Sequence, residues 1–211
     1  MKWRPSSGVT LPSAGFIEPC IPTRVMQAPK SADWIYELKM DGYRLMVRRL
    51  DDKVRIYSRR GADFTPRFPR IVDAVRRLKV KSVLLDGEGV VYDQHGMPSF
   101  DLIHSKQYDR EVSLVAFDLL DLDGVDIRKR PLLDRKARLT KLITKVRDGI
   151  EFGEHVEGDG TDIFKAACKL GHEGIVAKRK DLPYESGRSK RWLKIKKPNS
   201  AAAKRIDDGT F

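Results

Sequence analysis

A lysine followed by an Asp-Gly pair is the clearest sign of chemistry in this sequence. Lys39 ends an apolar, strand-like run that begins at Trp34, and Asp41-Gly42 and Arg44 follow it. An Asp-Gly pair after a strand is typical of a turn, so we expect Lys39 at the edge of a sheet. Glu37 shares its face, because strand side chains alternate. A buried lysine can lose its proton and act as a nucleophile, although the same stretch also fits a solvent-facing hairpin.

Carboxylates recur downstream in two short motifs. Asp86-Gly87-Glu88 follows an apolar run, and we expect it to place a carboxylate where a strand turns. Glu173 precedes an apolar strand, and Lys178 lies at the end of that strand. Each motif alone also fits a carboxylate in water, but two of them supply the oxygen ligands that Mg²⁺ prefers.

Cations and an aromatic residue complete a set suited to nucleotides. Lys194 and Lys196 share one face of a strand whose other face carries Leu193 and Ile195, and Phe117 lies in an apolar strand. The cations suit a triphosphate and the aromatic suits a base. The sequence has no Gly-rich Walker loop, which excludes a P-loop NTPase. Phosphates would therefore be held by side chains.

The net charge favours a polyanionic partner. The chain of 211 residues carries a formal charge of +12 and has a pI near 9.7. Basic residues crowd the stretches 59–81 and 178–197, and Tyr184 and Trp192 lie within the second. Phosphate contacts combined with aromatic stacking would suit nucleic acid better than an anionic membrane.

The sequence also indicates the cellular compartment. No apolar run approaches the roughly 20 residues that cross a bilayer, and the N-terminus lacks the apolar centre of a secretory signal. We therefore expect a cytoplasmic protein without a membrane partner. Cys20 and Cys168 are far apart and fit two free thiols in a reducing compartment. The four histidines show no metal-ligand spacing, so no zinc site is predicted.

Strand and helix signals alternate without βαβ regularity, which predicts an α+β protein with largely antiparallel sheets. After an irregular segment 1–30, strands begin at Trp34. The predicted strands are a hairpin of 43–50 and 53–59, a bent strand or strand pair at 82–92, and strands at 112–120, 174–177 and 191–196. The predicted helices are 69–78, one starting at Pro131 with a stripe of Leu139, Leu142, Ile143 and Val146, and one capped by Thr161 or Asp162 that ends at Gly171.

Taken in order, six motifs resemble those of the adenylation (nucleotidyltransferase) domain of ATP-dependent DNA ligases, especially the ligase modules of bacterial end-joining repair proteins. The motifs are ELKMDGYR at 37–44, SRRG at 58–61, DGE at 86–88, FDLL at 117–120, EGIVAK at 173–178 and WLKIK at 192–196. The resemblance implies a nucleotidyltransferase (ATP-grasp-like) fold, with mainly antiparallel sheets flanked by helices. The adenylation domain would occupy 31–197, between the irregular segment 1–30 and a tail at 198–211.

The resemblance also implies a role for each motif. Lys39 would attack the α-phosphorus of ATP, expel pyrophosphate and carry AMP as a lysyl phosphoramidate. AMP would then pass to a 5′-phosphate at a nick in double-stranded DNA, where the 3′-hydroxyl displaces it. The implied contacts are Glu37 on the adenine edge, Phe117 on its face, Arg44 and Arg59 on the nucleotide, Glu88 and Glu173 on the ribose and Mg²⁺ (or Mn²⁺), and Lys178, Lys194 and Lys196 on the α-phosphate.

A nucleophilic lysine needs a lowered pKa. With a pKa of ~10.4, a free lysine is neutral in about one molecule in a thousand near pH 7.4. We expect neighbouring cations, namely Lys194, Lys196 and bound Mg²⁺, to favour the neutral amine of Lys39 and to stabilise charge on the α-phosphate.

The sequence departs from the family after Lys197. Fourteen residues follow, too few for the five-stranded oligonucleotide-binding barrel that usually comes next. We expect a complete nucleotide pocket, with a barrel or an end-binding repair protein supplied in trans for ligation near the bacterial nucleoid. Two alternatives stay open: an RNA ligase or other nucleotidyltransferase of the same superfamily, and a nick-binding module without full ligation.

Overall fold

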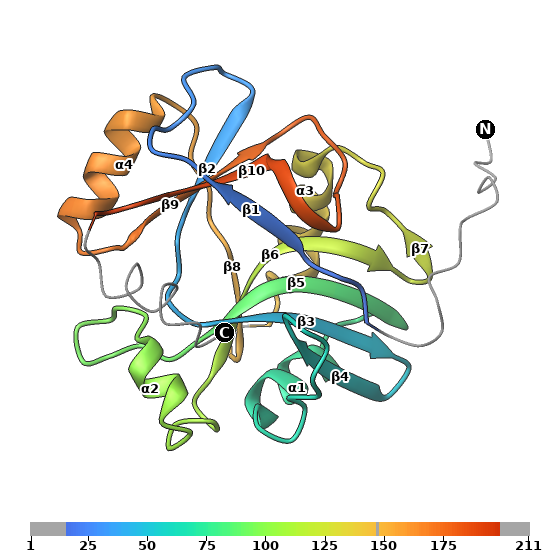
Figure 1. Ribbon diagram of the computed structural model, residues 1–211. Coiled ribbons are helices and arrows are strands. Elements are labelled where there is room, and N and C mark those ends of the chain that lie inside the picture. The colour runs from blue at the N-terminus through green and yellow to red at the C-terminus, as the bar shows by residue number, and fades with distance from the viewer. Residues whose placement is uncertain (1–15, 147, 199–211) are drawn as a thin grey trace, which may run out of the picture.

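Two β-sheets face each other in the computed structural model, which describes residues 16–146 and 148–198 (Figure 1). The smaller sheet has the order β1-β10-β9-β2, and the larger has the order β4-β3-β5-β6-β7 with β8 beside β6. The smaller sheet comprises β1 (Cys20–Arg24), β2 (Trp34–Leu38), β9 (Gly174–Arg179) and β10 (Gly187–Lys196). The larger sheet comprises β3 (Tyr43–Leu50), β4 (Lys53–Ser58), β5 (Ser82–Val90), β6 (Ser113–Leu122), β7 (Val125–Asp126) and β8 (Ile150–Phe152).

Four helices flank the sheets in the described residues. They are α1 (Pro69–Arg76), α2 (Phe100–His104), α3 (Leu132–Ile143) and α4 (Gly160–Lys169). α4 packs on β9 and β2 of the smaller sheet, and α1 packs on the larger sheet (Figure 1). The strand pairs are antiparallel except for β1 with β10 and β6 with β8. The α+β prediction is confirmed. None of the helices in these ranges is long and apolar enough to span a bilayer.

Both faces of β3 are buried, so this strand separates two apolar clusters. Leu45 and Val47 join α1 in one apolar cluster, whereas Met46 between them joins a second cluster with side chains of both sheets. This division follows from the alternation of strand side chains. Phe117 and Trp192 belong to the second cluster, which therefore fills the space between the sheets beside the site.

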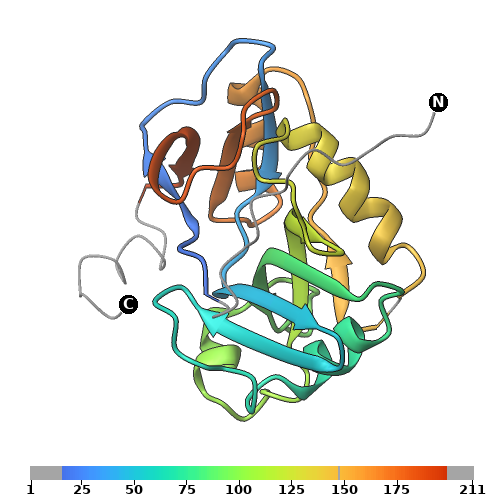
Figure 2. The same cartoon turned by 90° about the vertical axis from the view of Figure 1, so that its right-hand side faces the viewer.

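The chain crosses from one sheet to the other at the Lys39 motif. β2 ends at Leu38 in the smaller sheet and β3 begins at Tyr43 in the larger one, as the light-blue trace shows (Figures 1 and 2). Asp41-Gly42 is therefore part of a crossover and not a hairpin turn. A Cβ at Gly42 would lie 2.1 Å from the carbonyl oxygen of Gly89, so this approach requires glycine.

Several local predictions need correction. Cys20–Arg24 forms strand β1 inside the segment expected to be irregular, because its partner β10 is far away in sequence. Asp86-Gly87-Glu88 lies within the single long strand β5 and makes no turn. Asp159, not Thr161 or Asp162, caps α4, because its carboxylate accepts from both of their amides. Pro131 is the residue before α3, and Val146 lies beyond its end. The elements α2, β7 and β8 were not expected from the sequence, and residues 1–15, 147 and 199–211 lie outside the described ranges.

Candidate active site

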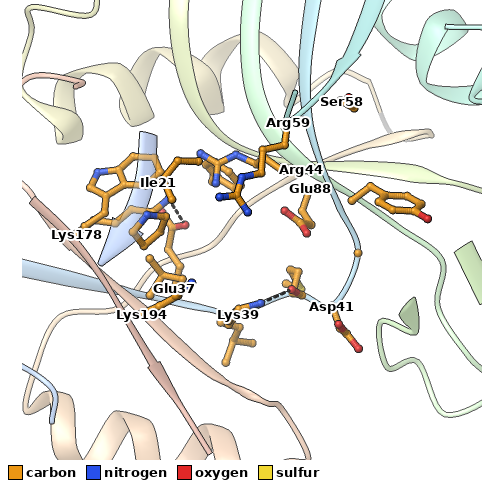
Figure 3. A pocket seen from close by; sticks show the side chains of 18 of the residues that line it. Ile21, Glu37, Lys39, Asp41, Arg44, Ser58, Arg59, Glu88, Lys178 and Lys194 are labelled. Atoms are coloured by element: carbon orange, nitrogen blue, oxygen red, sulfur yellow. Dashed lines mark hydrogen bonds and ion pairs between the residues drawn. The ribbon is translucent and has the colours of Figure 1, made fainter. Parts of the chain in front are cut away.

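A cavity of about 420 Å³ lies between the two sheets, with walls from both (Figure 3). Its walls carry the predicted nucleophile and the residues predicted to hold the nucleotide. These are Glu37, Lys39, Arg44, Arg59, Glu88, Phe117, Lys178, Lys194 and Lys196. Residues from distant parts of the sequence therefore meet at one site.

Lys39 lies at the crossover with its ammonium group paired to a carboxylate. Its side chain is 22% exposed and forms an ion pair with Glu173. Its Nζ also donates to the carbonyl of Met40 at 3.4 Å (Figure 3). Glu173 is 8% exposed, and no donor within the described residues hydrogen-bonds either of its oxygens. Lys196 approaches it at 3.8 Å. Glu173 is not among the residues that line the cavity, but it contacts the ammonium group of Lys39.

Glu37 is buried between two lysines and does not face open solvent. Its Oε1 accepts from Lys136 Nζ at 2.7 Å, and its Oε2 accepts from Lys178 Nζ at 2.5 Å. Burial opposes ionisation, but the two ammonium groups hold the pKa of Glu37 below its usual value. Glu37 is therefore a fixed anion at the cavity wall.

Two cations lie against the ring of Phe117. Lys178 Nζ is 3.9 Å from the Phe117 ring centroid and 4.0 Å from that of Trp192. Arg44 Cζ is 4.6 Å from the Phe117 centroid. A base that stacks on Phe117 must share the ring with these cations or displace them. Burial lowers the pKa of Lys178 to about 8, although Glu37 opposes the shift.

Arg44 is held in place by the buried carboxylate of Asp86. Its Nε and Nη2 donate to the two oxygens of Asp86 at 2.6 and 2.8 Å, and Nη2 also contacts the Cys20 carbonyl at 3.2 Å. The Tyr184 hydroxyl donates to Asp86 at 2.6 Å. Asp86 is 0% exposed, so this carboxylate positions Arg44 and does not meet solvent.

Buried charge perturbs the remaining groups in the cavity. Burial raises the pKa of Glu88 to about 7, with Glu173 adding to the shift and Lys39 and Arg44 opposing it. Burial, together with the charge of Lys39, lowers the pKa of Lys196 to about 8.

The cationic side of the cavity extends to a second pair of residues. The pKa of Lys194 is lowered by burial and by Lys39 and Arg59, and that of Arg59 by burial and Arg44. Neighbouring cations that lower one another's pKa indicate a region of positive electrostatic potential, and such a region suits a polyphosphate.

One aromatic residue lies away from the expected place and one residue was missed. Tyr184 and Trp192, expected to stack in a basic cluster, are 8% and 3% exposed and belong to the apolar cluster between the sheets, but Trp192 also lines the cavity. The missed residue is Lys136 on α3, whose ammonium group donates a hydrogen bond to Glu37. Its position carried a signal, because Leu132, Lys136, Leu139 and Ile143 follow helical spacing and share the buried face. A lysine inside an apolar stripe needs a buried partner.

Glu88 and Glu173 fit a divalent cation only in part. Within the described residues, no group of three or more acidic, histidine or cysteine side chains could hold a metal. The two oxygens of Glu173, buried without hydrogen bonds, are nevertheless suitable ligands. A cation such as Mg²⁺ commonly uses one or two carboxylates together with phosphate oxygens and water. The donor set therefore fits a metal that arrives with a nucleotide.

A partly buried lysine, buried carboxylates and several further cations between two mainly antiparallel sheets fit a nucleotidyltransferase-type site. The family described as ATP dependent DNA ligase domain matches residues 20–196. The multifunctional non-homologous end joining protein LigD of Pseudomonas aeruginosa is 38% identical over 92% of this chain and 23% of its own length. The corresponding Mycobacterium tuberculosis protein is 38% identical over 81% of this chain and 22% of its length. This chain thus spans about a quarter of the curated relatives' length.

Solved structures agree. The chain resembles a mycobacterial DNA ligase D complexed with ATP and MES, with a TM-score of 0.75 and 36% identity over 84% of this chain and 59% of that one. It also resembles the ligase domain of M. tuberculosis LigD, with a TM-score of 0.73 and 34% identity over 84% of this chain and 60% of that one. The chain belongs to the ATP-dependent DNA ligase domain family.

Proposed function

We propose that residues 31–197 form the adenylation domain of an ATP-dependent DNA ligase that acts in end joining. The observation that carries the proposal is the placement of Lys39. It lies in a cavity with several cations and is paired with the buried Glu173. A relative's structure contains ATP, which supports the nucleotide as donor.

In the first step, Lys39 Nζ gives up a proton to water and forms a bond to the α-phosphorus of ATP. The bond from that phosphorus to the bridging oxygen breaks, and pyrophosphate leaves. Lys178, Lys194 and Lys196 line the cavity and stabilise the negative charge that develops on the α-phosphate. Burial is the main cause of the lowered pKa values of Lys178 and Lys196, and neighbouring ammonium groups add to it, so a bound anion would favour their charged forms.

The cavity lining supports the proposed base contacts, because Glu37, Phe117, Arg44 and Arg59 all belong to it. Glu37 would meet the adenine edge and Phe117 its face, while the two arginines would contact the nucleotide. Glu88 would meet the ribose and, with Glu173, would hold Mg²⁺ or Mn²⁺. When bound, the metal would neutralise charge on the polyphosphate.

AMP then passes from Lys39 to the 5′-phosphate at a nick, and a 3′-hydroxyl displaces it to form the phosphodiester. Nicked double-stranded DNA is the acceptor that the family favours. The excess of basic residues supports a polyanion. A barrel or an end-binding repair protein in trans would clamp the DNA. The protein would act at the nucleoid in the bacterial cytoplasm.

Labelling tests the proposal. The protein is incubated with α-labelled ATP and Mg²⁺, denatured, separated by electrophoresis and mapped by peptide. We expect label on Lys39 in the native protein. Lys39→Ala and Lys39→Arg should carry none, since arginine stays protonated. Lys165→Ala, on the exposed face of α4 with a side chain 71% exposed, is the matched lysine control and should keep the label. Undiminished label on Lys39→Ala would refute the assignment. Competition between nicked DNA and nicked RNA then identifies the acceptor.

A further inference from the structure

Lys136 occupies an unusual place for a lysine. It is 1% exposed, and its ammonium group reaches acceptors from three separate segments. It donates to Glu37 Oε1 at 2.7 Å, to the Gly153 carbonyl at 2.8 Å and to the Phe117 carbonyl at 3.3 Å. An ammonium group has three donors, so each one is used. Lys136 is not among the residues that line the cavity, and it acts through the residues it holds.

The residues that Lys136 holds are the two assigned to the base. Glu37 comes from β2 in the smaller sheet, and Phe117 comes from β6 in the larger one. Lys178 grips the other oxygen of Glu37, so the carboxylate is fixed from two sides. Each carboxylate oxygen keeps a further lone pair, and Glu37 lines the cavity. The edge of the carboxylate on the cavity side can only accept hydrogen bonds.

We propose that Lys136 is a positioning residue for base selection: it fixes Glu37 as an acceptor for the 6-amino group of the ATP base. The inference rests on the proposed function. An acceptor-only edge favours an exocyclic amine and disfavours a carbonyl oxygen at the same position, because two acceptors repel. Adenine has the amine and guanine has the carbonyl. Lys136 also donates to the main-chain carbonyl of Phe117, so it positions both the carboxylate that meets the base edge and the ring that meets the base face.

A purely structural role is the competing explanation, and α3 supplies its control. Arg135 is adjacent, 0% exposed and paired with Asp118, also 0% exposed, through hydrogen bonds of 2.7 and 2.8 Å. Neither residue lines the cavity. Arg135→Lys perturbs a buried ion pair of the same helix without touching Glu37. It should lower stability and leave base selection unchanged.

The test compares ATP with purine riboside triphosphate, which lacks the 6-amino group. Dissociation constants are measured by calorimetry with EDTA present, for the native chain, Lys136→Met, Lys136→Gln and Arg135→Lys, after circular dichroism shows that each variant is folded. We expect the native chain and Arg135→Lys to prefer ATP by about tenfold to a hundredfold, the range for one hydrogen bond to a charged acceptor. Lys136→Met should reduce the preference to about threefold or less, and Lys136→Gln should lie between.

Three results would overturn the inference. They are a native preference below about threefold, an unchanged preference in folded Lys136→Met, and an equal loss in Arg135→Lys. If neither Lys136 variant folds, the residue acts in stability alone and the inference also fails. Because binding is measured without turnover, absence of label on Lys39 would defeat the proposed function separately. A native chain that carries label on Lys39 but does not prefer ATP would defeat only this inference.

Discussion

Removing one hydroxyl from Tyr184 should weaken the link between the two sheets. The Tyr184 hydroxyl donates to Asp86 on β5 at 2.6 Å and accepts from the Cys20 amide of β1 at 2.8 Å. Burial and the charge of Asp86 raise the pKa of Tyr184 well above its ordinary value, so the hydroxyl keeps its proton and remains a donor. Tyr184→Phe removes both hydrogen bonds and leaves the ring in place.

The expected cost follows from the two partners. Loss of a hydrogen bond to a charged acceptor costs about 1.5–3 kcal/mol, and an amide left buried without a partner costs about 1–3 kcal/mol. Asp86 keeps both bonds from Arg44, so its charge stays compensated. We therefore expect a total near 3 kcal/mol. For a chain of this size, that loss lowers the melting temperature by about 6–12 °C.

Urea denaturation followed by circular dichroism measures this loss. Tryptophan fluorescence is unsuitable, because the Trp192 ring lies 5.8 Å from the Tyr184 ring and would report the substitution itself. Tyr57→Phe is the control, since Tyr57 packs against the same cluster from a half-buried position, and it should cost less than about 1 kcal/mol. Asp86→Asn leaves Arg44 uncompensated and should cost the most, about 3–5 kcal/mol. Equal losses in the two tyrosine variants would refute the reasoning.

Three further predictions concern backbone, thiol and charge. Gly42→Ala should prevent folding or lower the melting temperature by more than about 10 °C in a thermal scan, because the alanine Cβ would lie 2.1 Å from the Gly89 carbonyl oxygen. A melting curve like that of the native chain would contradict the crossover geometry. Burial raises the pKa of Cys20 to about 12, so iodoacetamide at pH 8 should modify the more exposed Cys168 and spare Cys20. Peptide mapping measures the modification, and equal labelling of both thiols would contradict the burial of Cys20. The pKa of Lys178 falls from 10.5 unfolded to about 8 folded, so the unfolded chain binds more protons between those values, and the free energy of unfolding should rise with pH there by at most about 3 kcal/mol. Lys178→Met should show a smaller rise than the native chain in urea titrations at pH 8 and 10, because Lys196, whose pKa is also lowered to about 8, still contributes in that range. A rise equal to that of the native chain would contradict the burial argument.

Local patterns predicted the strands that carry the site. The Lys39 run, the apolar strand around Phe117 and the alternation of Lys194 and Lys196 with Leu193 and Ile195 each hold in the structure. Period-two alternation depends on the strand alone, so it can be recognised without knowing the partner strands.

Features that depend on distant partners could not be predicted in this way. β1 contains Pro22 and is short, and it becomes a strand only because β10 lies beside it in parallel. Asp86 follows an apolar run and precedes glycine, which favoured a turn. Gly87 instead admits the close approach of β6, since a Cβ there would lie 2.7 Å from Leu114 Cδ1. The strand continues, and Asp86 becomes a buried anchor for Arg44.

Helix α3 shows how buried charge joins the fold to the site. Arg135 and Lys136 are consecutive, and both are almost fully buried. Arg135 pairs with Asp118 of the larger sheet, and Lys136 pairs with Glu37 of the smaller one. Each carboxylate would be costly to bury alone, so α3 can dock only where both ion pairs form. Arg135 thus holds the helix to the larger sheet, whereas Lys136 holds Glu37, the one of these two carboxylates that lines the cavity.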